Sequence, residues 1–172
     1  MTDDDTTARR PASRAEAAAL ASAVRLRIIR LTARRALTNK EIAQRLGKDP
    51  ATTLYHVRKL VATGFLVALP PRTGARGSRE IPYQGTHLSW QLTDKADYAD
   101  EIGQAALAAY LEEVTDVGIG ELRQTRIVLR LDEAALDEFA GRIKDLLEEF
   151  DQRTPGPNSQ DVGVYVAWYP SR

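Results

Sequence analysis

The stretch from Pro50 to Arg79 holds the side chains of this sequence that are best suited to binding a polyanion. It contains hydroxyls, a phenol, an imidazole and several cations, and it contains no Asp or Glu. Such groups donate hydrogen bonds to phosphate oxygens and to base edges, whereas a carboxylate would repel phosphate. The chemistry predicted for this stretch is therefore contact with a nucleic acid.

A helix is predicted from Pro50 to about Thr63, because Asp is a strong N-cap and Pro favours the first helical position. At about 100° per residue, one side of this helix is apolar and predicted to face the core: Leu54, Val57, Leu60 and Val61. The opposite side is polar: Thr52, Tyr55, His56 and Lys59, with Ala51 and Arg58 flanking it.

These outward residues divide by the contact that each can make. Thr52, near the helix N-terminus, is the best candidate for a base edge, whereas Tyr55 and Lys59 suit phosphate better. His56 is interpreted as facing DNA, the alternative being a packed histidine that braces the helix. His87 is interpreted as structural.

The loop from Arg72 to Arg79 is rich in Arg, Gly and Ser, and it carries Arg72, Arg76 and Arg79. Guanidinium groups are attracted by the negative potential of a narrow minor groove. Each phosphate contact that such a group makes releases counterions, so these residues predict a steep dependence of binding on salt.

Two capping boxes and a turn signal position these groups. Ser13 with Glu16, and Thr38 with Glu41, each have the capping-box spacing. The first box begins either one helix that ends near residue 35 or two helices that meet near Ser22. The second begins a short helix over residues 39–46, and the following glycine suits a left-handed turn. Helix, short helix, tight turn and helix is the helix-turn-helix order.

Strands and further helices are expected after this motif. Residues 65–69 form a predicted strand, and residues 81–84 and 87–92 are expected to pair as strands. Thr93 or Asp94 is expected to cap a long helix that ends near Val117. Residues 126–131 and 161–169 are predicted strands. They flank a helix that begins at Asp132 and carries an apolar stripe: Leu136, Phe139, Ile143, Leu146 and Phe150.

The segments 24–31, 37–43 and 54–61, with Gly64 and Leu66-Val67, resemble the ArsR-type winged-helix repressors. The resemblance covers about residues 20–95. It implies a homodimeric transcription regulator that binds double-stranded DNA and dimerises through its long first and last core helices. The candidates for DNA contact are Thr38, Ala51, Thr52, Tyr55, His56, Arg58, Lys59, Arg72, Arg76 and Arg79.

The charge of the chain is unevenly distributed. Residues 8–80 carry sixteen Lys and Arg against four Asp and Glu, whereas residues 81–172 carry eight against seventeen. The net charge is zero only because these two regions and the acidic residues 1–7 cancel. A basic part joined to an acidic part is typical of a polyanion-binding module attached to something else.

Several other classes of function are not expected. The 172-residue chain contains no Cys, which excludes disulfides and Cys-ligated metal sites, and its two histidines lie far apart. We therefore expect no metal and no cofactor. The sequence contains no nucleophile elbow, phosphate-binding loop or dinucleotide fingerprint, so no enzyme is predicted. No apolar run is long enough to span a membrane, and the N-terminus is unlike a signal peptide, so a cytoplasmic protein is expected.

The predicted fold is mainly α with a small β component. Residues 1–12 are expected to be a disordered tail, residues 13–92 a winged helix-turn-helix domain, and residues 93–172 a dimerisation helix with a strand–helix–strand extension. The acidic group Glu112, Glu113, Asp116 and Glu121 is interpreted as a solvated face, the alternative being a cation site. Two other functions stay open: a winged-helix protein–protein adaptor, and a regulator gated by a small-molecule effector.

Overall fold

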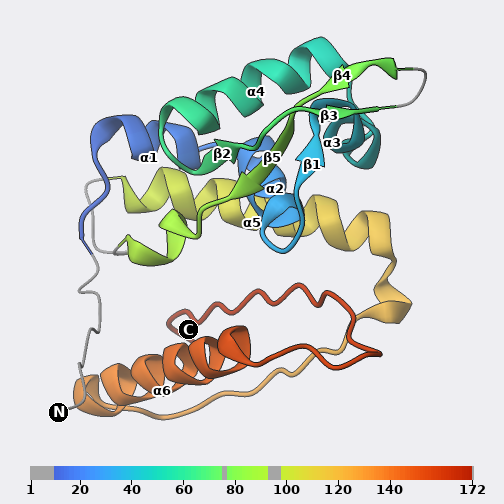
Figure 1. Cartoon of the computed structure of the whole chain (residues 1–172). Helices are drawn as coiled ribbons and strands as arrows, with labels where there is room; N and C mark the ends of the chain where they lie inside the picture. Colours follow the sequence, from blue (N-terminus) through green and yellow to red (C-terminus); the bar gives the residue numbers. More distant parts are fainter. Residues whose placement is uncertain (1–9, 75–76, 93–97, 172) are drawn as a thin grey trace, which may run out of the picture. The chain divides into compact units, whose positions relative to one another are not determined.

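The computed structural model describes residues 10–74, 77–92 and 98–171, which divide into two units (Figure 1). Unit 1, Met1–Glu121, contains the helices α1 to α5 and both small sheets. Unit 2, Leu122–Arg172, contains helix α6. The fold is therefore α+β with helices predominating, as the sequence predicted.

Helices α1 (Arg14–Leu20) and α2 (Ala23–Thr32) are separate, so the two-helix alternative is correct. Ser13 and Glu16 form the predicted capping box at the start of α1. Ser22, the N-cap of α2, is extended and interrupts the helix. Arg25 stabilises the break, because its guanidinium donates hydrogen bonds to the carbonyls of Ala18 at 2.6 Å and Ala19 at 2.5 Å. A cation that satisfies the last carbonyls of a helix is a favourable C-terminal arrangement.

The turn between α3 (Asn39–Leu46) and α4 (Pro50–Ala62) forms as its residues predict. Gly47 follows α3 with φ of 61°, a conformation that L-residues with a side chain rarely adopt. The Asp49 carboxylate accepts hydrogen bonds from the backbone N–H groups of Ala51 at 2.8 Å and Thr52 at 3.1 Å. Helix α4 ends at Ala62, one residue short of the predicted end.

The central sheet has the order β1-β5-β2 and is antiparallel. Its strands are β1 (Leu37–Thr38), β2 (Leu66–Ala68) and β5 (Pro82–Gly85). The expected strand over residues 87–92 is wrong, because Leu88–Gln91 form the short 3-10 helix η2. Strand β5 has a partner on both of its edges, so no edge remains for residues 87–92 to pair with.

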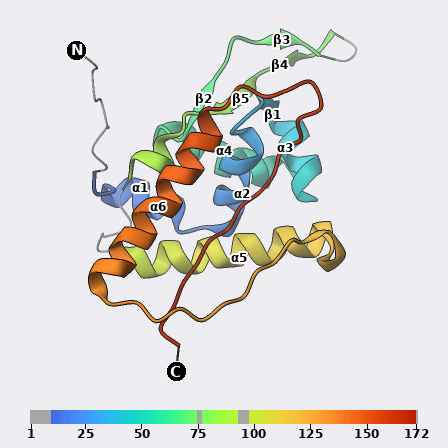
Figure 2. The ribbon, with the colours of Figure 1, turned by 90° about the horizontal axis from the view of Figure 1, so that it is seen from below.

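A second hairpin forms the wing. Strands β3 (Arg72–Thr73) and β4 (Arg79–Glu80) pair antiparallel, with Thr73 opposite Arg79. The loop expected over residues 72–79 is therefore shorter than predicted, because both of its ends are paired. Figures 1 and 2 show this hairpin projecting beyond the helices of unit 1.

One hydrophobic core holds these elements together. Its fully buried side chains come from α2, α3, α4 and the start of β2: Ile28, Ile42, Val57, Leu60 and Phe65. Gly85 lets β5 approach the end of α2, because a Cβ at this position would lie 3.4 Å from the Cα of Ala33. The core thus packs the sheet and α4 against α2.

The expected tail over residues 1–12 is wrong for its last three residues. The backbone N–H of Arg10 donates to the carbonyl of Gln91 at 3.0 Å, and Ala12 packs against the core. The Arg10 guanidinium also bonds both carboxylate oxygens of Glu16, at 2.9 and 2.5 Å. Residues 1–9, and the expected caps Thr93 and Asp94, lie outside the described residues.

Ion pairs join α2 to the long helix α5 (Ala99–Val117). Arg27, only 8% exposed, bonds Glu112 at 2.8 Å and Asp116 at 2.5 Å. Arg30 lies 2.6 Å from the carboxylate of Glu113. The side chains of Glu112 and Asp116 stay exposed, as the interpretation of a solvated face predicts, whereas that of Glu113 is more buried. All three are also counterions of α2. The short 3-10 helix η3 (Ile119–Glu121) ends unit 1.

Unit 2 forms one of its three predicted elements. Helix α6 (Glu133–Gln152) begins where expected, with the Asp132 carboxylate accepting from the N–H of Ala135 at 2.9 Å. The strands predicted over residues 126–131 and 161–169 are wrong, because neither segment belongs to a sheet. A strand requires a partner ladder, and neither segment has one in this chain.

We expect the Arg27 ion pairs to contribute measurably to folding. Arg27→Met keeps the apolar stem and removes two charge-assisted hydrogen bonds, so it should lower the free energy of unfolding by about 1–3 kcal/mol. Urea denaturation followed by circular dichroism measures this change. The matched control is Arg45→Met on an exposed position of α3, which should cost at most about 0.5 kcal/mol. Equal losses in the two variants would contradict this role.

We expect the Arg10–Glu16 pair to make stability depend on acid pH. The hydrogen bonds from Arg10 lower the pKa of Glu16 from 4.5 to about 2. The unfolded chain therefore takes up this proton first, so the stabilisation is complete above pH 4.5 and is lost as pH falls to about 2. The stability difference between wild type and Glu16→Gln should shrink over this range in urea titrations. Arg10→Met should show the same effect, and a difference that is constant with pH would refute it.

Candidate nucleic-acid interface

Helix α4 presents a polar and basic face to solvent. Tyr55 is 66% exposed and lies at the centre of this face, with Ala51 and Arg58 one turn away on either side. Thr52 is also exposed, and Lys59 is half-buried. Of the predicted outward set, Thr52 and Tyr55 are exposed, whereas His56 and Lys59 are half-buried. Ala51 and Arg58, which were predicted to flank this set, are both exposed.

The buried face of α4 matches the prediction in part. Val57 and Leu60 are buried as predicted, and Leu54 and Val61 are only half-buried. Thr53, which was not predicted to face the core, is fully buried. Thr53 tolerates burial because its hydroxyl donates to the carbonyl of Asp49 at 2.9 Å. The sequence signal was a threonine four residues after a helix N-cap, which can satisfy its own hydroxyl locally.

His56 lies at the boundary between the two faces. It is half-buried, and its Nδ1 is buried without a hydrogen-bond partner among the described residues. Its ring meets that of Tyr55 edge to face, with 5.4 Å between the centroids. Burial lowers the pKa of His56, and the positive charges of Arg25 and Lys48 lower it further. The surroundings of His56 therefore favour the neutral form of its imidazole.

Arg25 and Lys48 are two basic residues near α4 that the sequence reasoning missed. Both act electrostatically on the pKa of His56. Arg25 comes from α2 and is held by the carbonyls at the end of α1. Lys48 precedes α4 directly, which was a usable signal. The position of Arg25 depends on tertiary packing, so it could not be read from the helix pattern of α4.

The wing is tied to the helix-turn-helix by one of its arginines. Arg72 lies 3.1 Å from the carboxylate of Glu41 on α3 and 3.8 Å from that of Glu80. The pKa of Glu41 is lowered, first by the N–H of Thr38 and then by Arg72. Arg72 thus braces the base of the hairpin and is half exposed.

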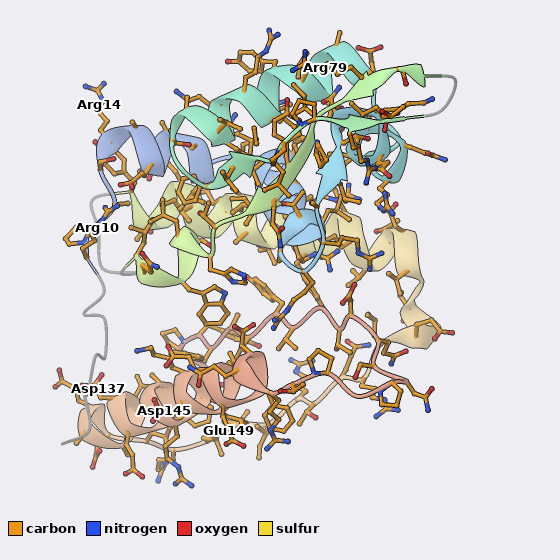
Figure 3. The ribbon with its side chains drawn as sticks, viewed as in Figure 1. Arg10, Arg14, Arg79, Asp137, Asp145 and Glu149 are labelled. Carbon is orange, nitrogen blue, oxygen red and sulfur yellow. The ribbon has the colours of Figure 1, made fainter. Side chains whose placement is uncertain are left out.

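The other two wing arginines are placed differently. Arg79 is exposed on β4, on the projecting hairpin (Figure 3). Arg76 lies outside the described residues. The described part of the wing therefore offers Arg79 to an external ligand.

Thr38 belongs to the scaffold and not to the exposed face. It is 4% exposed, and its hydroxyl accepts a hydrogen bond from the N–H of Glu41 as the cap of α3. The neighbouring Asn39 donates from its side chain to the carbonyl of Pro50 at 2.8 Å. This bond joins the start of α3 to the start of α4. Thr38 and Asn39 thus help to orient α4 from its buried side.

The described residues form neither a metal-binding cluster nor a membrane-spanning helix. They contain no group of three or more His, Asp or Glu side chains arranged to hold a metal ion. None of their helices is both long and apolar enough to cross a membrane.

Comparison with known proteins bears on this site. Residues 20–67, from the end of α1 to β2, match the family model described as a helix-turn-helix domain. No curated protein matches the sequence. The match spans the helices α2 to α4 whose geometry is described above.

Two solved structures resemble the chain distantly. The adhesin competence repressor AdcR from Streptococcus pyogenes is 18% identical, with 74% of this chain and 81% of that chain covered and a TM-score of 0.34. A mutant of ZitR from Lactococcus lactis in apo form is also 18% identical, with 77% and 86% covered and a TM-score of 0.34.

We expect His56 to titrate below pH 6.5 because of its burial and its cationic neighbours. A nuclear magnetic resonance titration of the imidazole nitrogens measures the midpoint. Lys48→Met removes one of the cationic causes and should move the midpoint upward. Lys40→Met, an equal change of charge on α3, is the control and should not. A wild-type midpoint at or above 6.5, or equal responses to the two variants, would contradict the assignment.

Proposed function

We propose that this chain, a DNA-binding transcription regulator with a helix-turn-helix domain over residues 20–67, binds its operator as a homodimer. Each subunit places α4 in the major groove and the β3–β4 wing on the adjacent backbone or minor groove. The observation that carries the proposal is the exposed face of α4, which is free of carboxylates, in a unit whose wing hairpin also exposes Arg79.

The exposed side chains of α4 have complementary roles in this complex. Thr52 lies in the first turn of the helix and is placed to meet a base edge, as recognition helices use their N-terminal residues. Tyr55, Arg58 and Lys59 donate to phosphate oxygens or to bases farther along the groove. His56 supports Tyr55 through their ring contact and lies at the margin of the face.

The wing supplies a second point of contact. Its brace between Arg72 and Glu41 connects the hairpin to α3, which also positions the start of α4. The hairpin and the recognition helix are thus each linked to α3. Arg79, together with Arg76, is assigned to the backbone or the minor groove.

Helix α5 offers a surface for dimerisation. The side that meets α2 carries the buried Ala109 and the carboxylates paired with Arg27 and Arg30. Another side carries exposed apolar residues, Leu107 and Leu111, which a second copy would cover. A two-fold dimer requires a pseudo-palindromic operator with half-sites about 34 Å apart.

The proposal is tested by the salt dependence of DNA binding. A duplex obtained by unbiased selection of bound sequences is titrated by fluorescence anisotropy between 50 and 200 mM salt, a range over which phosphate contacts weaken strongly. Arg58→Ala, Arg76→Ala and Arg79→Ala should each weaken binding and reduce the salt slope by about one unit. Arg142→Ala, the same change on exposed α6, is the matched control and should leave the slope unchanged.

The outcomes separate the proposal from its alternative. Wild-type affinity no higher than background at physiological salt would favour the protein–protein adaptor and overturn the proposal. Binding with an unchanged slope in Arg76→Ala and Arg79→Ala would remove the wing from the interface. Thr52→Ala should lower affinity for the selected site more than affinity for random DNA, since a lost base contact reduces specificity.

A further inference from the structure

Unit 2 contains two extended segments that have the pattern of strands and no ladder. Residues 126–131 and 161–169 are rich in β-branched and other apolar side chains, and the second segment also carries aromatic ones. Neither segment forms a strand in the structure (Figure 1). Their apolar side chains are largely exposed, with Val128 at 76% and Val164 at 64%. Extended apolar segments that expose backbone donors and acceptors are templates for pairing with another chain.

Helix α6 contacts one of these two segments through its apolar stripe. Its apolar stripe includes Phe139, whose ring meets the ring of Trp168 edge to face at 5.7 Å between centroids. Successive residues of an extended segment point to opposite sides. The side chains in phase with Trp168, namely Val162, Val164 and Val166, therefore belong to the same face as the helix contact.

One chain supplies too few strands for this arrangement. A strand–helix–strand unit contributes at most two parallel strands, and a stable sheet in water needs three or more strands with an apolar face. A second copy of the chain raises the number to four and supplies a second helix. The homodimer proposed above supplies this second copy.

The charges of the two segments decide which of them lies at the centre. Residues 162–171 carry no charged side chain, so they can pair with their own copy without repulsion. Self-pairing of the other segment about Val128 would place Arg126 opposite Arg130 of the partner subunit. Like charges directly opposite each other destabilise a sheet. Arginines instead suit an outer edge, where they discourage further pairing.

We propose that two copies of unit 2 form a shared four-stranded sheet in which residues 161–169 of the two protomers pair antiparallel across the two-fold axis. Residues 126–131 form the two outer edges, and both α6 helices pack on one face. This inference rests on the proposed homodimer. It assigns a pairing partner to residues 161–169, namely the same segment of a second copy of the chain.

A cysteine scan tests this arrangement directly, because the full chain contains no Cys. Single substitutions at positions 163 to 167, including Val164→Cys, Tyr165→Cys and Val166→Cys, are oxidised mildly and run on non-reducing gels. One position, or two adjacent ones, should give disulfide-linked dimers in high yield, because the residues at the axis face their own copies. Val128→Cys at the outer edge and Glu138→Cys on exposed α6 are the controls and should stay monomeric.

The readouts keep this inference separate from the proposed function. Cross-linking at positions 163 to 167 no stronger than at Glu138→Cys would overturn the shared sheet, and so would strong cross-linking of Val128→Cys. DNA binding by the same reduced variants is measured in parallel. Wild-type DNA binding without cross-links defeats only the sheet, whereas cross-links without DNA binding support the sheet and defeat the proposed function.

Discussion

The rotation of α4 about its own axis is the constraint on which the interface depends. Burial of Thr53, Val57 and Leu60 against the core fixes that rotation, and it leaves Tyr55 and Arg58 pointing outward. The start of the helix is held independently by the Asp49 cap and by the bond from Asn39 to Pro50. A helix held by its core face and its first turn has one exposed face, which is a requirement for reading a groove.

Several basic residues of unit 1 are paired with carboxylates inside the chain. Arg10, Arg27 and Arg30 are bound by Glu16 and by the carboxylates of α5, and Arg72 is bound by Glu41. These arginines hold the fold together. The basic residues that face outward on α4 and β4 form a smaller set, to which the proposed function assigns contact with DNA.

The two units differ in how far their segments are stabilised by contacts within the chain. In unit 1 most hydrogen-bonding and apolar needs of the described segments are met within the chain, and the core forms around α2 and α4. In unit 2 helix α6 is stabilised by its own residues, through its Asp132 cap and pairs such as Arg142–Glu138 along the helix. Figure 3 shows Asp137, Asp145 and Glu149 along this acidic helix. A strand cannot satisfy itself in this way, so its structure depends on a neighbour.

The sequence by itself determined the elements that are stabilised locally. The caps at Ser13, Thr38, Asp49 and Asp132 and the glycine after α3 acted through neighbours within four residues, and each formed as predicted. Tertiary structure alone decided the features that depend on distant partners. These include the burial of Thr38 and Thr53, the approach of Arg25 to α4, and the pairing of Arg27 with Glu112. They also include the strands: β5 acquired two partners and excluded residues 87–92, whereas residues 126–131 and 161–169 found none. The physical reason is that a helix closes its hydrogen bonds within its own segment, while a strand or an ion pair forms only where the fold brings a second segment alongside.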